Sequence, residues 1–475
     1  MSNRRDFLKL AGIAGCGIAG CGIVKEKDIS DKEEMDFIRK AAEKKHVQTF
    51  NMSGYVAPKL DTVRIGYIGV GSRGSGAVQL AANIGNVEVV AVCDVVQEKV
   101  DSTIKSVQGK FKPEAYVGEN AWKKVCERND IDMIYICTPW EMHAPMSIYA
   151  MKQGKHVAVE IPAAITMDEC WELVETSEKT KKHCMMLENT CYDFFEMLTL
   201  NMARHGFFGE VVHVEGAYLH DIFESLFNKK ARWNLWRLRN NFTSGSLYPM
   251  HGLGPICQIL NVNCGDKMDY MVSMSSDDFM MKSKAEEMAK EDPDFEPFVK
   301  NGNFRGNMST TIIKTAKGKT IMVQHDVSSP RPYSRLHTIS GTKASAQKYP
   351  LPGRVAVGHE WLKEEEIKEL EEKYTPELIK KVGKIAKEVG GHGGTDYLLT
   401  WRMIDCLRNG LPLDQSVYDA AAWSSIIPLS KWSVANGSRP INIHDFTSGK
   451  WKTNKEFDLT LTGGGTTKVC GMSIL

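Results

Sequence analysis

The 475-residue chain lacks an excess of charge of either sign. Its 60 Lys and Arg residues stand against 59 Asp and Glu residues, a formal net charge of +1, and this balance argues against a nucleic-acid partner because nucleic-acid-binding surfaces are basic. The 12 cysteines include no C-x-x-C pair, so we predict no metal site and expect thiols in apolar strands, such as Cys93 and Cys184, to be free and buried. Internal repeats and low-complexity tracts are also absent. With 42% hydrophobic and 25% charged residues, the composition is that of a globular protein.

The N-terminal apolar run, Leu10–Val24, is too short and too rich in glycine for a stable membrane span. Arg4 and Arg5 precede it, which is the arrangement of a twin-arginine export signal. Two I-A-G-C segments end at Cys16 and Cys21 and resemble the lipobox, in which the cysteine is lipidated. We favour Cys21 because it leaves the longer apolar run, with Cys16 or simple signal cleavage as alternatives. We therefore expect a protein exported by the twin-arginine route that is a membrane-anchored lipoprotein or periplasmic.

A glycine-rich turn is the most informative motif of the chain. In R-I-G-Y-I-G-V-G-S-R-G-S-G, Gly69, Gly71 and Gly74 form G-x-G-x-x-G between a predicted strand and a predicted helix. Such a turn lets a pyrophosphate approach the backbone at the helix N-terminus. A second strand, V-E-V-V-A-V-C, ends at Asp94, at the spacing of a carboxylate that accepts both ribose hydroxyls of an adenosine. We predict a dinucleotide site here, and the alternative is a doubly wound domain with an empty crevice.

The apolar runs that follow predict an α/β fold with a parallel sheet. Helical stretches at 142–153 and 167–181 separate these runs, which gives the strand–helix alternation of a doubly wound domain. The runs are continuous, as in strands covered on both faces. They lie at 132–138, 156–160 and 184–189.

From about Thr190 the pattern changes to alternating apolar and polar residues, as in antiparallel strands with one wet face. These runs lie at 211–218, 308–315, 320–325 and 336–340. We therefore predict an N-terminal Rossmann domain followed by a C-terminal α+β domain with an open, mostly antiparallel sheet. The predicted division is an export signal with lipobox at 1–24, a tether at 25–60, the dinucleotide-binding Rossmann domain at 61–189 and the substrate-binding domain at 190–475.

Polar and aromatic residues stand at the carboxyl ends of the later strands, which face the ligand crevice in such sheets. Trp140 is expected to lie against the cofactor, and His143 either to bind a ligand or to be a packed, helix-capping residue. A second cluster, Gly390–Asp396 with the sequence G-G-H-G-G-T-D, is either a flexible loop near a site or a chain crossing over the open sheet.

The order of these segments resembles the glucose-fructose oxidoreductase, inositol dehydrogenase and rhizopine catabolism superfamily over nearly all of the chain after the predicted tether. Most of its dehydrogenases carry E-K-P after the fourth strand, whereas this chain has Ile161 in place of that lysine. They also carry an Asp and, four residues on, a His that handles the substrate hydroxyl. This chain has Pro249 and Leu253 at those places. The ordinary dehydrogenase apparatus is therefore missing.

The segment that stands there, L-Y-P-M-H-G-L-G-P, follows W-R-L-R, and together with G-S-R-G, T-P-W-E-M-H and E-I-P-A-A it is similar to glycoside hydrolase family 109, the NAD-dependent α-N-acetylgalactosaminidases. The resemblance implies NAD⁺ held tightly and recycled in each turnover. Asp94 favours NAD over NADP, although Arg73 tempers that preference. The implied cofactor residues are Ser72, Arg73, Asp94, Trp140, Glu141, Met142, His143, Glu160, Ile161 and Asn189. The implied substrate residues are Tyr218, Arg237 (with Arg239 as the alternative), Tyr248, Pro249, Met250, His251 and Tyr333.

The resemblance also implies a hydrolysis cycle that replaces the carboxylate pair of ordinary glycosidases. NAD⁺ takes hydride from C3 of a terminal α-linked N-acetylgalactosamine, the C2 proton is removed, the aglycone leaves from C1, water adds at C1, and the hydride returns to C3. We expect His251, Tyr248 and Tyr333 to be catalytic, each as acid or base, with Arg237 stabilising charge. The alternatives are an NAD-dependent sugar oxidoreductase of the same superfamily and a non-catalytic sugar-binding lipoprotein. By analogy with the superfamily, the open sheet would form a homodimer.

Overall fold

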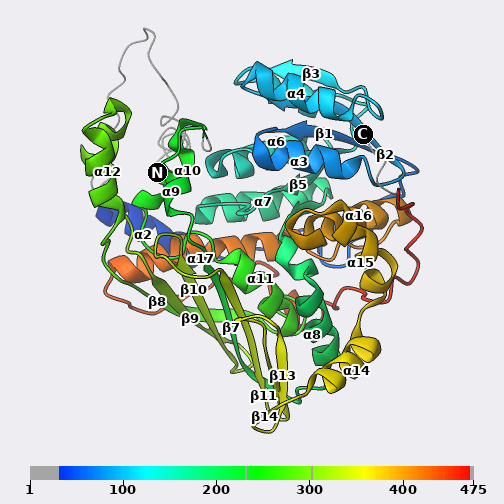
Figure 1. Ribbon diagram of the computed structural model, residues 1–475, viewed down its shortest axis with the longest axis vertical. Coiled ribbons are helices and arrows are strands. Elements are labelled where there is room, and N and C mark those ends of the chain that lie inside the picture. Colours follow the sequence, from blue (N-terminus) through cyan, green and yellow to red (C-terminus); the bar gives the residue numbers. More distant parts are fainter. Residues whose placement is uncertain (1–30, 231–232, 301–302, 471–475) are drawn as a thin grey trace.

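The computed structural model describes residues 31–230, 233–300 and 303–470, in which two sheets and the helices around them make up the molecule (Figure 1). The predicted export signal, with Cys16 and Cys21, lies outside the described residues. Within those residues no helix is long and apolar enough to cross a bilayer. The cysteines described are unpaired, and Cys93 and Cys184 are buried as predicted.

The N-terminal half contains a six-stranded sheet in the order β3-β2-β1-β4-β5-β6. All of its pairings are parallel, which confirms the predicted doubly wound sheet. The strand order reverses between β1 and β4, the place where such sheets bind ligands. The elements are β1 (Val63–Ile68), α3 (Ser72–Ala81), β2 (Val87–Asp94), α4 (Gln97–Val107), β3 (Glu114–Val117), α5 (Ala121–Glu127), β4 (Met133–Ile136), α6 (His143–Lys152), β5 (His156–Val159), α7 (Met167–Thr180) and β6 (Cys184–Met186).

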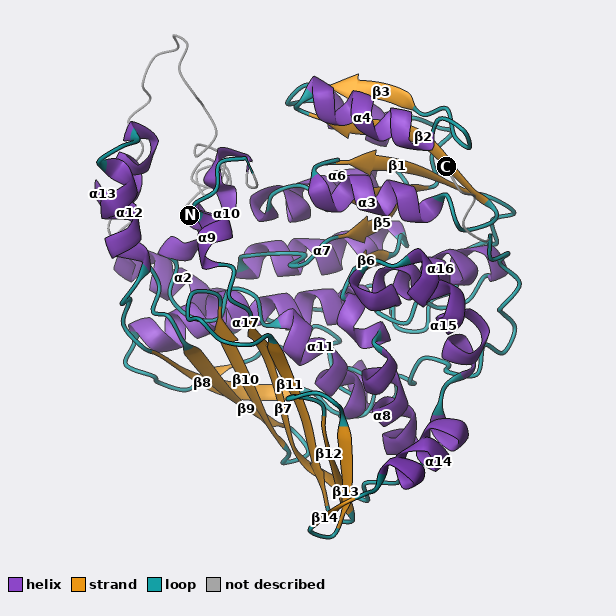
Figure 2. Ribbon diagram, viewed as in Figure 1, coloured by secondary structure: helices purple, strands orange, loops and turns teal. Residues whose placement is uncertain are grey.

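The C-terminal half contains a nine-stranded sheet in the order β14-β13-β12-β11-β7-β10-β9-β8-β15. Only β10 and β7 pair in parallel, and every other pairing is antiparallel, as predicted. Helices cover one face of this sheet and leave the other open (Figure 2). The strands are β7 (Val211–Leu219), β8 (Met268–Ser275), β9 (Ser309–Thr315), β10 (Thr320–Asp326), β11 (Ser334–Gly341), β12 (Ala344–Gln347), β13 (Arg354–Val357), β14 (Glu360–Trp361) and β15 (Ile441–Asn442).

Helix α11 crosses the covered face of this sheet very close to β7. A Cβ added at Gly252 would lie 2.1 Å from the Ala217 nitrogen, and one added at Gly216 would lie 2.3 Å from the Gly252 carbonyl oxygen. The two glycines therefore bring the start of α11 against the middle of β7. The remaining helices are α2 (Asp31–Ala42), α8 (Phe194–Arg204), α9 (Phe223–Leu226), α10 (Trp236–Arg239), α11 (Met250–Ile259), α12 (Met281–Ala289), α13 (Glu296–Lys300), α14 (Glu364–Tyr374), α15 (Glu377–Val389), α16 (Thr395–Asn409) and α17 (Val417–Ala435).

Residues 31–60, which belong to the segment predicted as a tether, are packed against the rest of the molecule. Ile38 is only 5% exposed, and α2 lies against α7 and α17. The His46 ring nitrogen Nε2 lies 3.2 Å from both carboxylate oxygens of Glu178. The prediction of a tether is therefore wrong for these residues. The many charged residues of α2 suggested a solvated segment, but the helix also has a narrow apolar stripe, which includes Ile38 and Ala42 and is buried.

Candidate active site

Each glycine of the predicted turn has a separate structural reason to lack a side chain. Gly69 has φ +83°, a conformation that favours glycine. A Cβ at Gly71 would meet nothing within 4 Å, so this backbone faces open space. A Cβ at Gly74 would lie 1.9 Å from the Gly69 carbonyl oxygen. These are the three uses of glycine in a dinucleotide-binding turn: the tight bend, the close approach of the pyrophosphate and the packing of helix on strand.

Asp94 lies beside this turn with its carboxylate fixed by the backbone. Its Oδ2 accepts a hydrogen bond from the Val70 N–H at 2.7 Å, and its Oδ1 accepts one from the Val96 N–H at 3.0 Å. Each carboxylate oxygen keeps a further lone pair for a ribose hydroxyl. The turn and Asp94 together therefore fit the adenosine and pyrophosphate of a dinucleotide.

A cavity of about 1150 Å³ joins the turn to the C-terminal half. Its wall includes a large part of the predicted cofactor and substrate residues, on elements from both halves of the chain. They are Ser72, Arg73, Trp140, His143, Glu160, Ile161, Asn189, Tyr218, Arg237, Tyr248 and His251.

The other predicted site residues lie outside this wall. Met250, the first residue of α11, is completely buried in the core, and Pro249 stands at the helix N-cap. Tyr333 is 36% exposed; its ring lies 4.9 Å from the ring of His220, which lines the cavity. Asp94, Glu141 and Met142 are likewise absent from the cavity wall.

His143 reaches the cavity, but both of its ring nitrogens are taken. Nδ1 lies 2.7 Å from the Pro162 carbonyl oxygen and Nε2 lies 2.7 Å from the Thr138 carbonyl oxygen. Burial lowers the pKa of His143. The ring is therefore held by the backbone, as the packed alternative predicts, while the cofactor contact that the resemblance implies for His143, which lines the cavity, stays a prediction.

Aromatic rings enclose the sugar-facing part of the cavity. Trp140 stacks on Tyr248 with ring centroids 5.5 Å apart, and Trp236 meets Trp140 edge-on at 5.3 Å. The Arg237 guanidinium lies 5.1 Å from the centre of the Tyr248 ring, whereas Arg239 does not line the cavity. Flat rings with a few fixed polar groups suit the apolar face and the hydroxyls of a sugar.

The side chains that can transfer protons lie in this aromatic, sugar-facing part of the cavity. His251, in the first turn of α11, has its ring centre 5.1 Å from that of Tyr248 and 5.2 Å from that of Tyr218. Burial raises the pKa of Tyr248 well above its ordinary value, so its phenol is protonated. Burial also raises the pKa of Tyr333, although Arg335 donates to its hydroxyl at 3.2 Å and opposes the rise.

Arg73, on the glycine turn, holds two carboxylates from distant parts of the chain. Its Nε donates to Glu160 at 2.6 Å, and its two Nη groups donate to Asp396 at 2.5 and 2.9 Å. Asn189 donates to Asp396 at 2.7 Å. Burial by itself raises the pKa of Asp396, but His392 and Arg73 hold that pKa well below its usual range. Asp396 is thus an anion that ties the C-terminal half to the turn.

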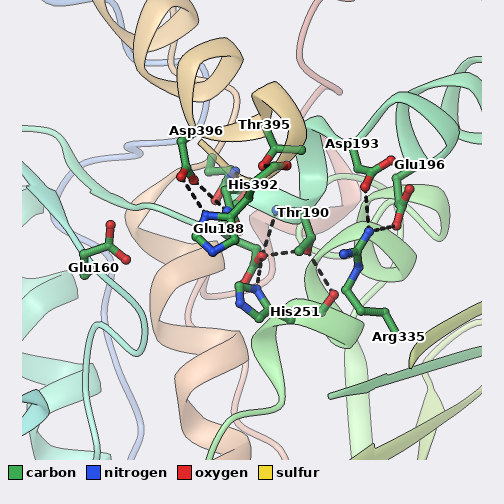
Figure 3. A network of polar contacts seen from close by, with 12 residues as sticks. Glu160, Glu188, Thr190, Asp193, Glu196, His251, Arg335, His392, Thr395 and Asp396 are labelled. Atoms are coloured by element: carbon green, nitrogen blue, oxygen red, sulfur yellow. Dashed lines mark hydrogen bonds and ion pairs between the residues drawn. The ribbon is translucent and has the colours of Figure 1, made fainter. Parts of the chain in front are cut away.

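The Gly390–Asp396 segment therefore lies at the site. Of its two alternatives, the structure supports the loop near a site over the chain that crosses the open sheet. His392 Nδ1 lies 2.7 Å from Asp396 Oδ2 (Figure 3), and this bond raises the pKa of His392. Every residue from Gly390 to Gly394 has positive φ, including His392 at +48°. Such a run of strained backbone is typical of functional sites. The sequence identified the loop of His392 and Asp396 by its glycines but assigned neither residue a role, and it assigned no role to His220 or Trp236, which also line the cavity.

Solved structures confirm the fold. A levoglucosan dehydrogenase in complex with NADH matches with a TM-score of 0.59 at 17% identity, over 81% of this chain and 100% of that one. The myo-inositol dehydrogenase of Lactobacillus casei in complex with NAD(H) and myo-inositol matches with a TM-score of 0.56 at 14% identity, over 81% and 97%. At such identities the likeness concerns the fold alone.

The fold and the glycine turn define the class, a protein with an NAD-binding Rossmann domain of the oxidoreductase type. Residues 63–188 match the family model of that domain, and residues 192–453 match the model of the glycosyl hydrolase 109 C-terminal domain. A glycosyl hydrolase family 109 protein of Bacteroides fragilis strain YCH46 is 46% identical over 425 residues, 85% of this chain and 89% of that protein. A Bacteroides fragilis protein named alpha-N-acetylgalactosaminidase is 46% identical over 408 residues, 84% and 95%. The chain belongs to glycosyl hydrolase family 109.

Proposed function

We propose that this chain hydrolyses terminal α-linked N-acetylgalactosamine by an NAD⁺-dependent cycle of oxidation at C3, elimination, water addition and re-reduction. The name of the relative that is 46% identical supports the substrate. The observation that carries the mechanism is that one cavity is lined by the residues of the dinucleotide turn and by Tyr248 and His251. The two carboxylates on its wall, Glu160 and Asp396, are both bound to Arg73, which argues against their use as the acid and base of an ordinary glycosidase.

The residues around the turn fit the cofactor. The open backbone at Gly71 would receive the pyrophosphate, Asp94 would hold the adenosine ribose, and Trp140 would lie between the cofactor and the sugar. Bound NAD⁺ would supply the hydride acceptor for C3 of the sugar and return the hydride at the end of the cycle.

The proton steps fall to side chains of the aromatic part. His251 Nδ1 is bound to Glu188 at 2.8 Å, so Nε2 is the nitrogen left to take the C2 proton, which a neighbouring C3 carbonyl makes acidic. The protonated phenol of Tyr248 is a donor for oxygen that gains charge in that step, with Arg237 beside it. The bond to Asp396 raises the pKa of His392, which favours this residue as the proton donor to the departing aglycone oxygen.

The test is release of nitrophenol from p-nitrophenyl α-N-acetylgalactosaminide by purified protein without added cofactor, while NADH absorbance is followed. We expect sustained release with no accumulation of NADH. Stoichiometric NADH formation without nitrophenol release would instead favour the sugar oxidoreductase alternative.

We also propose export by the twin-arginine route with a lipid anchor on Cys21. The paired arginines and the two I-A-G-C segments support it, and a route for folded cargo suits a protein that must acquire its dinucleotide in the cytoplasm. Fractionation of cells that make the Cys21→Ala variant tests it: loss from the membrane fraction is expected, and unchanged membrane association would contradict it.

The open sheet face supports a homodimer. Val272, Ile312 and Met322 stand side by side across β8, β9 and β10, and Ile312 is 39% exposed. Light scattering of the purified protein would show a dimer that an Ile312→Lys variant weakens; a wild-type monomer would contradict this proposal.

A further inference from the structure

A buried carboxylate that no step above uses lies directly behind His251. Glu188 follows β6 and is completely buried. Its Oε1 receives three donors: His251 Nδ1 at 2.8 Å, the Thr190 hydroxyl at 2.6 Å and the Thr190 N–H at 3.0 Å (Figure 3). Its Oε2 is buried and has no hydrogen-bond partner within the described residues. The burial of an anion is unfavourable unless it is compensated, and in the part of the chain that the structure describes the imidazole of His251 is the only side chain able to become a cation within ion-pair distance of this carboxylate.

The backbone is arranged to let Glu188 reach His251. A Cβ added at Gly254, one helical turn after His251 on α11, would lie 2.8 Å from Glu188 Cγ, so the absent side chain makes room for Glu188. The Thr190 hydroxyl lies 3.0 Å from the His251 carbonyl oxygen, and Gln415 donates to the Glu188 carbonyl oxygen at 3.1 Å. These contacts lie at the backbone carbonyl oxygens of both residues, so they fix the two segments from which the carboxylate and the imidazole meet.

The protonation state of this pair follows from its contacts. Burial by itself raises the pKa of Glu188, but His251 and the two Thr190 donors hold that pKa below its ordinary value. An ionised carboxylate only accepts hydrogen bonds, so the proton between the two groups belongs to His251 Nδ1. The nitrogen that remains for the cavity is therefore Nε2.

We propose that Glu188 is a positioning residue for proton transfer: it fixes His251 in the Nδ1–H tautomer with Nε2 toward the sugar, and its charge stabilises the imidazolium that forms when Nε2 takes a proton. This inference rests on the proposed function, because it needs His251 to accept the substrate proton. It adds a carboxylate that never touches substrate or cofactor and yet sets the rate of the proton step.

Because Oε2 of Glu188 has no hydrogen-bond partner among the residues described, a substitution can remove the charge of this side chain while its hydrogen bonds at Oε1 are kept. In Glu188→Gln the amide oxygen can keep all three donors while the NH₂ group takes the position that has no partner, so the variant removes the charge and leaves the acceptor. We expect kcat to fall about 100-fold, at the lower end of what a general base contributes. KM is expected to stay within about twofold and the bound NAD per chain to be unchanged, because neither depends on the imidazolium.

Glu178→Gln is the matched control. Glu178 is 1% exposed and also binds a histidine, His46, but it does not line the cavity. The kcat of the Glu178→Gln protein should therefore equal that of the wild type. Gly254→Ala is the second variant, because its added Cβ displaces Glu188 without removing it, and it should lower kcat in the same way. Nitrogen-15 spectra of histidine-labelled wild-type protein, assigned with His251→Ala, should show His251 as the Nδ1–H tautomer.

The outcomes separate this inference from the proposed function. The inference is supported if the Glu188→Gln or Gly254→Ala protein loses kcat at normal NAD content and the His251→Ala protein is inactive. A fully active Glu188→Gln protein beside an inactive His251→Ala protein would overturn the inference and leave the proposed function intact. An Nε2–H tautomer of His251 would overturn it as well. An active His251→Ala protein would overturn the proton-transfer role of His251 itself, and this inference with it.

Discussion

The Gly74→Ala substitution tests the cofactor turn at its tightest point. The added Cβ would lie 1.9 Å from the Gly69 carbonyl oxygen and 2.9 Å from the Gly69 carbonyl carbon. Both are backbone atoms and cannot swing away, so the turn must open by about 1.5 Å to reach ordinary van der Waals contact. Overpacking of this kind costs about 1–3 kcal/mol of folding free energy. The better helix propensity of alanine returns only about 1 kcal/mol of that.

The effect on the cofactor should exceed the effect on stability. Opening the turn moves the backbone N–H groups that would face the pyrophosphate, and each hydrogen bond to a charged group contributes about 1.5–3 kcal/mol. One such bond lost corresponds to an approximately 10- to 150-fold weaker affinity for NAD. The assay is the amount of NAD released per chain when purified protein is denatured, compared with the wild type.

Gly76→Ala is the matched control for stability. Gly76 lies in the same helix, and a Cβ there would meet nothing within 4 Å, so its free energy of unfolding should stay the same or rise. A Gly74→Ala protein that keeps wild-type NAD content and stability would refute the assignment of this turn to the pyrophosphate.

The remaining predictions concern the bond between the two halves and the phenol. Asp396→Asn removes the anion that binds Arg73, so bound NAD should be lost on dialysis far faster than from the wild type; equal retention would contradict a holding role for this pair. The raised pKa of His392 means that its bond to Asp396 stabilises the fold fully at pH below about 6.5 and loses this effect as the pH rises through the raised value. The difference in melting temperature between the wild type and His392→Gln should therefore shrink from pH 6 to pH 9. A difference that grows over this range would contradict the raised pKa of His392. Tyr248→Phe removes only a buried hydroxyl, so turnover should fall at least about 100-fold while NAD content stays normal; nitrophenol release at the wild-type rate would exclude Tyr248 from the chemistry.

The parts of the fold that the sequence revealed are those with strong local patterns. The strand before Gly69, the strand that ends at Asp94 and the alternating strands β7, β9 and β10 were all predicted, because burial on one or two faces leaves a clear period in the residues. Strand β3 was missed because its side chains are largely exposed. Helix α17 was missed because it is apolar on nearly all sides and so shows no helical period.

Predicting the site met a different obstacle. The turn and His251 carry recognisable motifs, whereas Asp396 reaches Arg73 across 323 positions of the chain, a contact that no local pattern can indicate. For His143 the sequence left ligand binding and packing open, and only the fold places the Pro162 and Thr138 carbonyl oxygens against its two nitrogens. Contacts that exist only in the folded chain therefore decide how the predicted residues are held.

The measurement that bears most directly on the central claim is the fate of the C2 hydrogen. The purified protein, without added cofactor, would be incubated with p-nitrophenyl α-N-acetylgalactosaminide in deuterated water, and the released sugar would be analysed by mass spectrometry and NMR. Oxidation and elimination require the C2 proton to leave and be replaced from solvent, so we predict deuterium at C2 of the product. A product that keeps its original hydrogen at C2 would contradict the account, because direct displacement at C1 never breaks that bond.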